Sequence, residues 1–225
     1  MKFSDIKFAR NHNEEFYKVL RKRVNEYFKE NNITRYANTM MVFKTIFMLL
    51  LYFVTFILIL SFVTNTWLIL GMWTLMGFGV AGIGLSIMHD ANHGAYSNKE
   101  SVNTIIGSVL YFLGGCDVNW RIQHNILHHT YTNVTGFDED INPGPVMRFT
   151  PHEKRRPHHK YQHIYAYFLY CLMTLMWFVT KDFNQAARYK KMGLIGTQKL
   201  SYTNLMTRII VSKIAYGLMI FGLPL

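Results

Sequence analysis

Residues 45–88, TIFMLLLYFVTFILILSFVTNTWLILGMWTLMGFGVAGIGLSIM, form a run of 44 residues without any Asp, Glu, Lys, Arg or His. A helix needs about 20 apolar residues to cross the hydrocarbon core of a membrane, so the run is long enough for two crossings. Thr64, Asn65 and Thr66 interrupt it near its middle, which predicts helices at about 45–63 and 67–88 joined by a tight turn. We therefore expect an all-α, multi-pass membrane protein built on a transmembrane hairpin.

The second predicted helix is rich in glycine, a residue that is costly in the interior of a soluble helix. In a bilayer, small residues allow neighbouring helices to approach closely, so the pattern is typical of packed membrane helices. The glycines are Gly71, Gly77, Gly79, Gly82 and Gly84.

The charged residues flank this hairpin, and the 225-residue chain carries 24 Lys and Arg against 13 Asp and Glu. Segment 1–44 has 10 basic and 5 acidic residues, and segment 181–213 has 7 and 1. Because basic flanks stay on the cytoplasmic side, we expect 1–44, the histidine-rich 89–163 and 181–213 all to be cytoplasmic. A basic chain could also bind nucleic acid, but no recognition motif accompanies these charges, so the expected partner is the lipid bilayer.

Two shorter apolar runs, at 102–116 and 164–179, are marginal in length for a crossing. A crossing by 164–179 alone would leave the basic segment 181–213 on the far side. We therefore expect both runs to lie in the membrane interface, with an ordinary membrane helix as the alternative for 164–179. Residues 214–225 are apolar again and predict the start of a further transmembrane helix. The sequence thus predicts one membrane domain over 1–225 that is incomplete at its C-terminus.

Five of the ten histidines form two clusters within 41 residues. His89 and His93 follow the hairpin directly, and their i, i+4 spacing on a helix places both imidazoles on one face, as a metal site requires. His124 and His128 repeat this spacing, while the adjacent His129 is rotated by about 100° on an α-helix and could reach a second metal, or the first from another side. Neutral imidazole binds zinc, copper, iron and nickel, so the clusters predict a metal site at the cytoplasmic face without choosing the metal.

The two clusters, within HDANHGAYS at 89–97 and WRIQHNILHHTYTN at 120–133, resemble the first two histidine boxes of membrane fatty acid desaturases. The order of segments is most similar to the front-end branch that acts on acyl-CoA or acyl-lipids, of the linoleoyl-CoA desaturase kind. The resemblance implies an O2-dependent oxidoreductase with two iron ions that introduces a double bond into an acyl chain. It also implies that the catalytic residues are the metal ligands themselves, and that a separate carrier of the ferredoxin or cytochrome b5 type supplies electrons.

Such desaturases carry a third box, a Gln or His followed by two adjacent histidines, after a further pair of membrane helices. The remaining adjacent pair here is His158 and His159, which together with His163 is the candidate substitute; a basic loop facing lipid headgroups is the alternative. The expectation is therefore a C-terminally truncated, catalytically incomplete desaturase.

Acidic and amide side chains near the boxes could orient the ligating imidazoles. Asp90 and Asn92 are the candidates for the first box, with simple solvation at the helix end as the alternative. The acidic loop at 138–140 follows the second box, and we expect it mainly to balance the basic residues at 148–156, with a role at the metal as the alternative.

Other functions remain open at this point. A related membrane di-iron hydroxylase would use similar boxes, and a non-catalytic membrane protein could retain a degenerate site. A metal transporter would place histidines or acids inside the spanning helices, and the hairpin at 45–88 has none.

Overall fold

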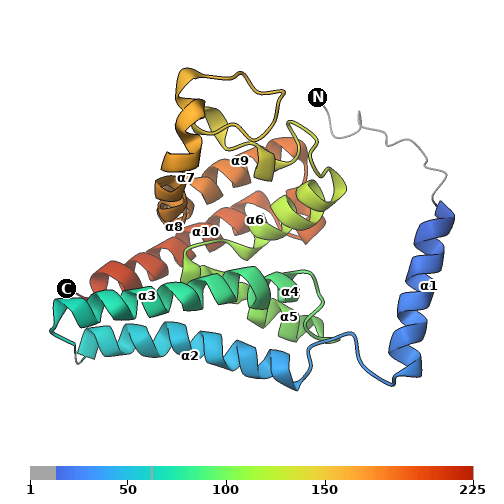
Figure 1. Cartoon of the computed structure of the whole chain (residues 1–225), viewed down its shortest axis with the longest axis horizontal. Helices are drawn as coiled ribbons and strands as arrows, with labels where there is room; N and C mark the ends of the chain where they lie inside the picture. The colour runs from blue at the N-terminus through green and yellow to red at the C-terminus, as the bar shows by residue number, and fades with distance from the viewer. Residues whose placement is uncertain (1–13, 62, 225) are drawn as a thin grey trace.

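The computed structural model describes residues 14–61 and 63–224, and within these residues every regular element is helical (Figure 1). Part of the N-terminal segment, residues 1–13, lies outside the described residues, as does Leu225. The helices are α1 (Glu14–Glu30), α2 (Thr39–Ser61), α3 (Thr66–Gly82), α4 (Met88–Asn92), α5 (Glu100–Gly107), α6 (Asp117–Arg121), α7 (Gln162–Cys171), α8 (Met173–Met176), α9 (Asp182–Met192) and α10 (Tyr202–Gly217). Wider π-helical turns form η2 (Ile83–Ile87), η4 (Ile122–His128), η8 (Trp177–Lys181) and η10 (Leu218–Gly222), and tighter 3-10 turns form η3 (Ser108–Leu113), η5 (Glu139–Ile141), η6 (Gly144–Val146), η7 (Pro157–Tyr161) and η9 (Ile195–Gln198).

The predicted hairpin is confirmed: α2 and α3 run side by side in opposite directions (Figure 1). The first helix begins six residues before the expected position, because the side chain of Asn38 accepts a hydrogen bond from the N–H of Met41 at 2.9 Å and caps the helix there. Lys44 therefore lies inside α2, where its long side chain can keep the charge at the membrane edge. The turn is as expected, with Asn65 accepting hydrogen bonds from the N–H groups of Trp67 and Leu68.

The second membrane helix extends past its expected end at Met88. α3, η2 and α4 form one continuous helix from Thr66 to Asn92, so His89 lies within the helix and His93 is its C-cap. A Cβ added at Gly79 would lie 3.0 Å from the backbone N of Tyr52 on α2, so this glycine permits the close approach of the two helices. A Cβ at Gly82 would meet Met48, whereas Gly71, Gly77 and Gly84 face open space.

Two separate apolar cores hold the described part of the molecule together. The first core packs α2 against the helix of residues 66–92 and against η3, with Tyr52, Ile83 and Leu110 almost completely buried. The second core packs α6 and η4 against α9 and α10, around Val118, Leu127 and other side chains of these helices. The first histidine box ends the helix of the first core, and the second box lies on the helix of the second, so the two boxes meet between the cores.

Three helices are long and apolar enough to cross a membrane, namely Thr39–Ser61, Thr66–Asn92 and Tyr202–Gly222. Two further stretches consist of paired helices, Glu100–Leu113 with Asp117–His128 and Pro157–Cys171 with Met173–Met192, bent by 111° and 59°. Each bent pair is long enough to be a broken span or a re-entrant loop, so the described residues contain three to five candidate spans. The interfacial position of 102–116 and 164–179 stays a prediction.

The third candidate span begins earlier than the sequence-based prediction for residues 181–225 places it. The expected basic segment 181–213 instead contains α9 and the first three turns of α10, and the span-length helix begins at Tyr202 rather than at 214. The prediction assigned the charged residues of α10, up to Lys213, to a basic segment outside the membrane. Lys213 is buried in an ion pair with Asp182 of α9 and also donates to the backbone carbonyl of Trp177 at 2.9 Å, so its charge does not end the helix.

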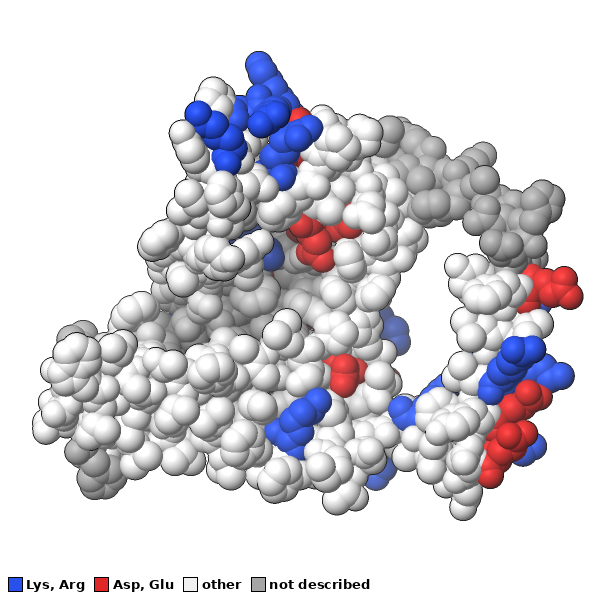
Figure 2. All heavy atoms as spheres, viewed as in Figure 1, with Lys and Arg blue, Asp and Glu red and all other residues white. Residues whose placement is uncertain are grey.

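The charges are distributed unevenly over the surface. Figure 2 shows that the face over α2 and α3 is almost free of charged side chains, whereas Lys, Arg, Asp and Glu gather on α1 and Lys and Arg near the loop that precedes α7. α1 stands apart from the other helices in Figure 1. This division into a charge-free belt and charged ends is what a membrane protein requires.

Candidate metal centre

Two chain segments bring the five box histidines together between the cores. His89 lies on α4, His93 follows it, and His124 lies on η4. The Nε2 atoms of His89 and His124 are 3.2 Å apart, and those of His129 and His124 are also 3.2 Å apart. The ring centroid of His93 lies 4.6 Å from that of His89 and 4.9 Å from that of His129. The predicted cluster of imidazoles is therefore present.

The second box does not have the α-helical phasing that its spacing predicts. Residues 122–128 form a π-helix, in which hydrogen bonds span five residues instead of four. This wider turn brings His129 back towards His124, five positions earlier, whereas an α-helix would point it elsewhere. His129 therefore lies beside His124 and His93, which is one of the two arrangements that the sequence left open for it.

His128 keeps the contact with His124 that its i, i+4 spacing predicts, and it also contacts the acidic loop. Its Nδ1 atom lies 3.1 Å from Asp138 Oδ1 and 3.2 Å from Asp140 Oδ2, while its ring stacks on that of His124 with centroids 5.3 Å apart. The carboxylates thus approach the side of the imidazole that carries Nδ1.

We expected the acidic loop at 138–140 mainly to balance the basic residues at 148–156, but its carboxylates contact His128 of the second box and Arg188 of α9. Asp138 is buried, and Glu139 pairs with Arg188 of α9 at 2.7 Å. Arg148, in contrast, donates to the backbone carbonyls of Pro151 and Glu153.

The two polar candidates at the first box separate in the structure. Asp90 Oδ1 lies 3.2 Å from His89 Nδ1, so this carboxylate can hold the imidazole of a predicted ligand. Asn92 is buried and makes other contacts: its side chain accepts from Arg121 at 3.1 Å and donates to the carbonyl of Gly107 at 3.3 Å. Asn92 therefore joins the first-box helix to α5 and to the second-box helix.

The surroundings shift the pKa of several groups at the site, among them His93 and Asp138. Partial burial, followed by the neighbouring imidazoles of His89 and His129, lowers the pKa of His93 from its ordinary value. Burial by itself would raise the pKa of Asp138, but hydrogen bonds from the N–H of Asn133, from His128 and from the N–H of Asp140 outweigh burial, so the pKa of this carboxyl is lowered. A neutral imidazole and an ionised carboxylate are the forms that metal binding needs.

Trp120 is a site residue that the sequence analysis missed. Its ring stacks on His124 with centroids 4.4 Å apart and lies 5.5 Å from His89 and 5.8 Å from His93. The signal was available, since Trp120 precedes His124 by four residues. The indole covers one side of the imidazole cluster with an apolar surface.

The remaining candidate ligands form a contact of their own. Nε2 of His158 and Nε2 of His159 lie 3.1 and 3.2 Å from the carbonyl oxygen of Pro145, and Nδ1 of His159 accepts from the N–H of Arg156. His163 is exposed on α7. Among the described residues, the groups close enough to hold a metal ion are His89, His93 and His124, and His128 with Asp138 and Asp140.

The donor atoms fit a metal ion. Two nitrogens that each bind one ion at about 2.1 Å, with an angle near 90–110°, lie about 3.0–3.4 Å apart. The two Nε2 separations of 3.2 Å that His124 makes fall in this range. Ligand atoms of His89, His93 and His124 all lie within 4.8 Å of one another, so small side-chain rotations suffice to complete the set.

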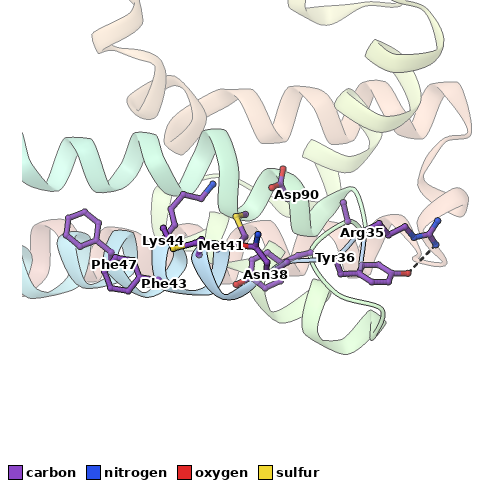
Figure 3. Close-up of a pocket in the computed structure, with 12 residues that line it drawn as sticks. Arg35, Tyr36, Asn38, Met41, Phe43, Lys44, Phe47 and Asp90 are labelled. Atoms are coloured by element: carbon purple, nitrogen blue, oxygen red, sulfur yellow. Dashed lines mark hydrogen bonds between the residues drawn. The ribbon is translucent and has the colours of Figure 1, made fainter. Parts of the chain in front are cut away.

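A pocket of about 720 Å³ opens beside the first box, at the N-terminal end of α2 (Figure 3). Met41 and Phe47 contribute apolar walls, and Arg35 and Lys44 contribute positive charge. Asp90 also lines the pocket and connects it to His89. Arg35 donates to the hydroxyl of the neighbouring Tyr36 at 3.3 Å, as the dashed line in Figure 3 marks. The pocket thus combines an apolar wall with cations at the edge of the membrane belt.

Comparison with known proteins gives a consistent answer. The family model described as "Fatty acid desaturase" matches residues 64–225. The chain is 35% identical to an acyl-lipid (8-3)-desaturase of Physcomitrium patens over 184 residues, which cover 81% of this chain and 38% of the relative. It is 35% identical to an sn-1 linoleoyl-lipid 6-desaturase of Arthrospira platensis over 162 residues, covering 72% and 44%, and 30% identical to the Delta(5) fatty acid desaturase A of Dictyostelium discoideum over 214 residues, covering 94% and 46%.

The chain spans about two fifths of the length of these relatives, from 38% to 46%. No solved structure matches it significantly. The family model includes both histidine boxes, two of the three span-length helices and the acidic loop. The chain belongs to the fatty acid desaturase family.

Proposed function

We propose that this chain carries the first two histidine boxes of a fatty acid desaturase, an oxidoreductase that introduces a double bond into an acyl chain with O2 as co-substrate. The observation that carries the proposal is the convergence of the His89, His124 and His129 Nε2 atoms, at separations of 3.2 Å, from two different parts of the chain. Imidazoles brought together in this way repel one another when protonated and are stabilised when neutral and bound to metal.

We propose that His89, His93, His124, His128 and His129 are ligands of two iron ions. Carboxylates support this set, because Asp90 faces Nδ1 of His89 and Asp138 faces Nδ1 of His128. An Nδ1–H that donates to a carboxylate leaves Nε2 as the free lone pair and fixes the plane of the ring. His158 and His159 are not in the proposed set, since their Nε2 atoms face the carbonyl of Pro145.

Bound iron with O2 would supply the strong oxidant that removal of hydrogen from an unactivated methylene requires, since no side-chain acid, base or nucleophile can replace it. The chain's own residues hold and shield the site. Asp90 and Asp138 orient imidazoles, and the indole of Trp120 keeps water from one side of the cluster. A dry, preorganised cluster favours reaction of the bound acyl chain over side reactions with water.

The proposed substrate is an acyl chain carried by a lipid, as the names of the relatives indicate for those proteins. The pocket at the start of α2 suits such a molecule, because its apolar wall can take part of the chain while Arg35 and Lys44 attract a phosphate. Lys44→Gln should then weaken binding of phospholipids measured by native mass spectrometry, while binding of an uncharged galactolipid and the behaviour of Lys99→Gln stay as in the wild type. If Lys44→Gln bound phospholipids as well as the wild type does, the proposal that Lys44 attracts a lipid phosphate would be contradicted.

We further propose that the histidine centre faces the cytoplasm, because basic segments lie on both sides of the hairpin. Iron chemistry with O2 needs electrons, and a separate carrier of the ferredoxin or cytochrome b5 type would deliver them at this face. The exposed Lys and Arg near the loop before α7 (Figure 2) could meet the acidic surface of such a carrier.

The experiment that tests the function uses the whole chain in native-like membranes with iron, a reducing system and acyl lipids. Replacing any of the five proposed ligands by Ala should lower the iron content, and unsaturated products detected by mass spectrometry should fall with it. His152→Ala is the matched control, because His152 is exposed and outside the cluster. Iron content and product formation that survive His89→Ala would contradict the proposed site, and hydroxylated instead of unsaturated products would contradict the proposed reaction.

A further inference from the structure

Helix α9 reaches the second histidine box through two buried amide side chains. Nε2 of Gln185 donates to Oε1 of Gln123 at 2.8 Å and to Oε2 of Glu139 at 2.7 Å. Gln185 and Gln123 have exposed fractions of only 6% and 9%, although 62 positions separate them in the chain. Two buried amides with complementary donors and acceptors form a specific contact rather than a chance one.

The path continues from Gln123 to the proposed metal centre. Nε2 of Gln123 donates to Oδ1 of Asp140 at 2.6 Å, and the other oxygen of this carboxylate, Oδ2, lies 3.2 Å from Nδ1 of His128. Asp140 is partly exposed, so it needs such a partner to hold its position. Asp138, in contrast, is held by the backbone N–H groups of Asn133 and Asp140.

The chemistry of the groups fixes the direction of this path. An ionised carboxylate accepts hydrogen bonds and cannot donate them. Glu139, which also accepts from Arg188 and Tyr189, therefore makes Gln185 present its NH2 group. The same NH2 group binds the oxygen of Gln123, so Gln123 must turn its own NH2 group to Asp140.

We propose that Gln185 is a positioning residue for the metal centre. It fixes the direction of the Gln123 amide, which holds Asp140 against Nδ1 of His128 and so leaves Nε2 of that imidazole directed to the metal. This inference rests on the metal centre proposed above and extends it to a helix that the sequence analysis treated only as a basic segment.

Gln185 also has a mechanical role from which the positioning role must be separated. Gln185, Arg188 and Tyr189 lie on one face of α9 and all bind Glu139, so they clamp the acidic loop. A variant that merely loosens the clamp would disturb the site for a different reason.

Exchanging donors and acceptors along the hydrogen bonds from Gln185 to Asp140 separates the positioning role from the clamping of the acidic loop. In the variant Gln185→Glu with Glu139→Gln, the amide at 139 donates to the carboxylate at 185, so the contact between helix and loop remains. The carboxylate at 185 must then accept from Gln123, which turns its oxygen towards Asp140 and repels it. Glu139→Gln alone is the control for the changed side chain at 139: its amide oxygen can still accept from Gln185 and keep the direction of the path, while the ion pair with Arg188 is lost.

Binding of Co²⁺ to the whole chain, followed by its visible absorption, reports on the centre without requiring activity. We expect the reversed variant to bind Co²⁺ about 10-fold more weakly and with an altered spectrum, the lower end of what partners of metal ligands contribute, while the control stays within about 2-fold of the wild type. In an Asp140→Asn background, the same reversal should change the affinity no further, because effects on one path are not additive.

The proposal would be overturned if the reversed variant bound Co²⁺ with wild-type affinity. It would also be overturned if the reversal weakened Co²⁺ binding in the Asp140→Asn background as much as it does in the wild type. If the reversed variant fails to fold, Gln123→Met keeps the packing and removes the donor to Asp140, and it should show the same loss; wild-type binding by Gln123→Met would also overturn it. In the metal-free chain, the Nδ1–H signal of His128 in NMR spectra should shift in the reversed variant and not in the control. If the wild-type chain bound no metal, the proposed function would be refuted. The NMR shift of His128 in the metal-free chain would still test whether Gln185 positions Asp140 through Gln123.

Discussion

The Nε2 atoms of His124 and His129 lie 3.2 Å apart although five positions separate the two residues in the chain. On an α-helix these side chains would point in clearly different directions. The π-helical turn at 122–128 brings them together, and it leaves His128 free to contact the acidic loop. The second box therefore divides its three histidines between two sets of partners.

The first prediction concerns this division. His129→Ala should reduce the amount of bound iron as strongly as His124→Ala, because both imidazoles contribute to the same cluster of nitrogens. Metal content of the purified chain, measured by mass spectrometry, checks this, with the exposed neighbour Thr130→Ala as the control. Normal metal binding by His129→Ala would mean that its contact with His124 is only a hydrogen bond between imidazoles.

The second prediction concerns pH. The pKa of Asp138 is lowered in the folded chain, so its ionised form stabilises the fold above the unfolded pKa, and this stabilisation is lost as the pH falls through the lower folded pKa. Asp138→Asn should therefore lower the thermal stability of the metal-free chain by a constant amount between pH 7 and pH 5, on the order of 1–2 kcal/mol for the weakened hydrogen bonds. Below about pH 4, where an unperturbed Asp titrates, the two melting temperatures should converge. A difference that grows on acidification would contradict this.

The third prediction compares two glycines of one helix. Gly79→Ala would place a Cβ 3.0 Å from the Tyr52 backbone N, so we expect a loss of about 1–3 kcal/mol from strain between the helices. Gly77→Ala meets no atom within 4 Å and should be neutral or stabilising by up to about 1 kcal/mol through helix propensity. Unfolding in mild detergent measures both, and equal effects would show that the hairpin does not pack as described.

The fourth prediction concerns the buried charge in the third span. Lys213→Met leaves the buried carboxylate of Asp182 without its partner, and breaking such a pair costs about 3–5 kcal/mol. Adding Asp182→Asn should recover much of this loss, because neither charge then remains in the interior. Arg208→Met on the exposed side of α10 is the control and should change the unfolding free energy little. A double variant as unstable as Lys213→Met would argue against the pairing.

The fifth prediction concerns topology. Single cysteines at the exposed positions Asn98 and Asn184 should react with an impermeant label from the cytoplasmic side, and one at Asn65 from the opposite side. Labelling of position 184 from the same side as position 65 would show that the bent pair from Pro157 to Met192 crosses the membrane.

The sequence alone predicted the hairpin and the meeting of the two boxes, because both depend on local patterns. A long charge-free run admits few structures in a membrane, and histidines at helical spacing near its end are close by geometry. The boundaries were less certain: Asn38 caps α2 through a side-chain bond, and Lys213 remains within a helix because Asp182, 31 positions earlier, neutralises it. A charge taken as the end of a span was in fact half of a buried pair.

The details of the centre depended on contacts that no local pattern contains. The π-helical turn is not visible in the spacing of His124, His128 and His129, and it brings His129 towards His124 while His128 also contacts the acidic loop. Trp120 could have been found from its spacing to His124, but the partnership of Asp140 with Gln123 and Gln185 joins three distant segments. Such contacts are decided by the tertiary fold.

The position of the two boxes in separate cores has a consequence for the order of assembly. The first box belongs to a hairpin that can insert as soon as residue 92 has been synthesised, whereas the second box is packed by α9 and α10, whose residues follow about 90 to 125 positions after residue 92. Because local units fold as the chain emerges, His89 and His93 are in place before the second box, which is packed only after α9 and α10 have been synthesised. The proposed ion, if bound by both boxes, would join the two cores, and its retention would report that both cores have formed.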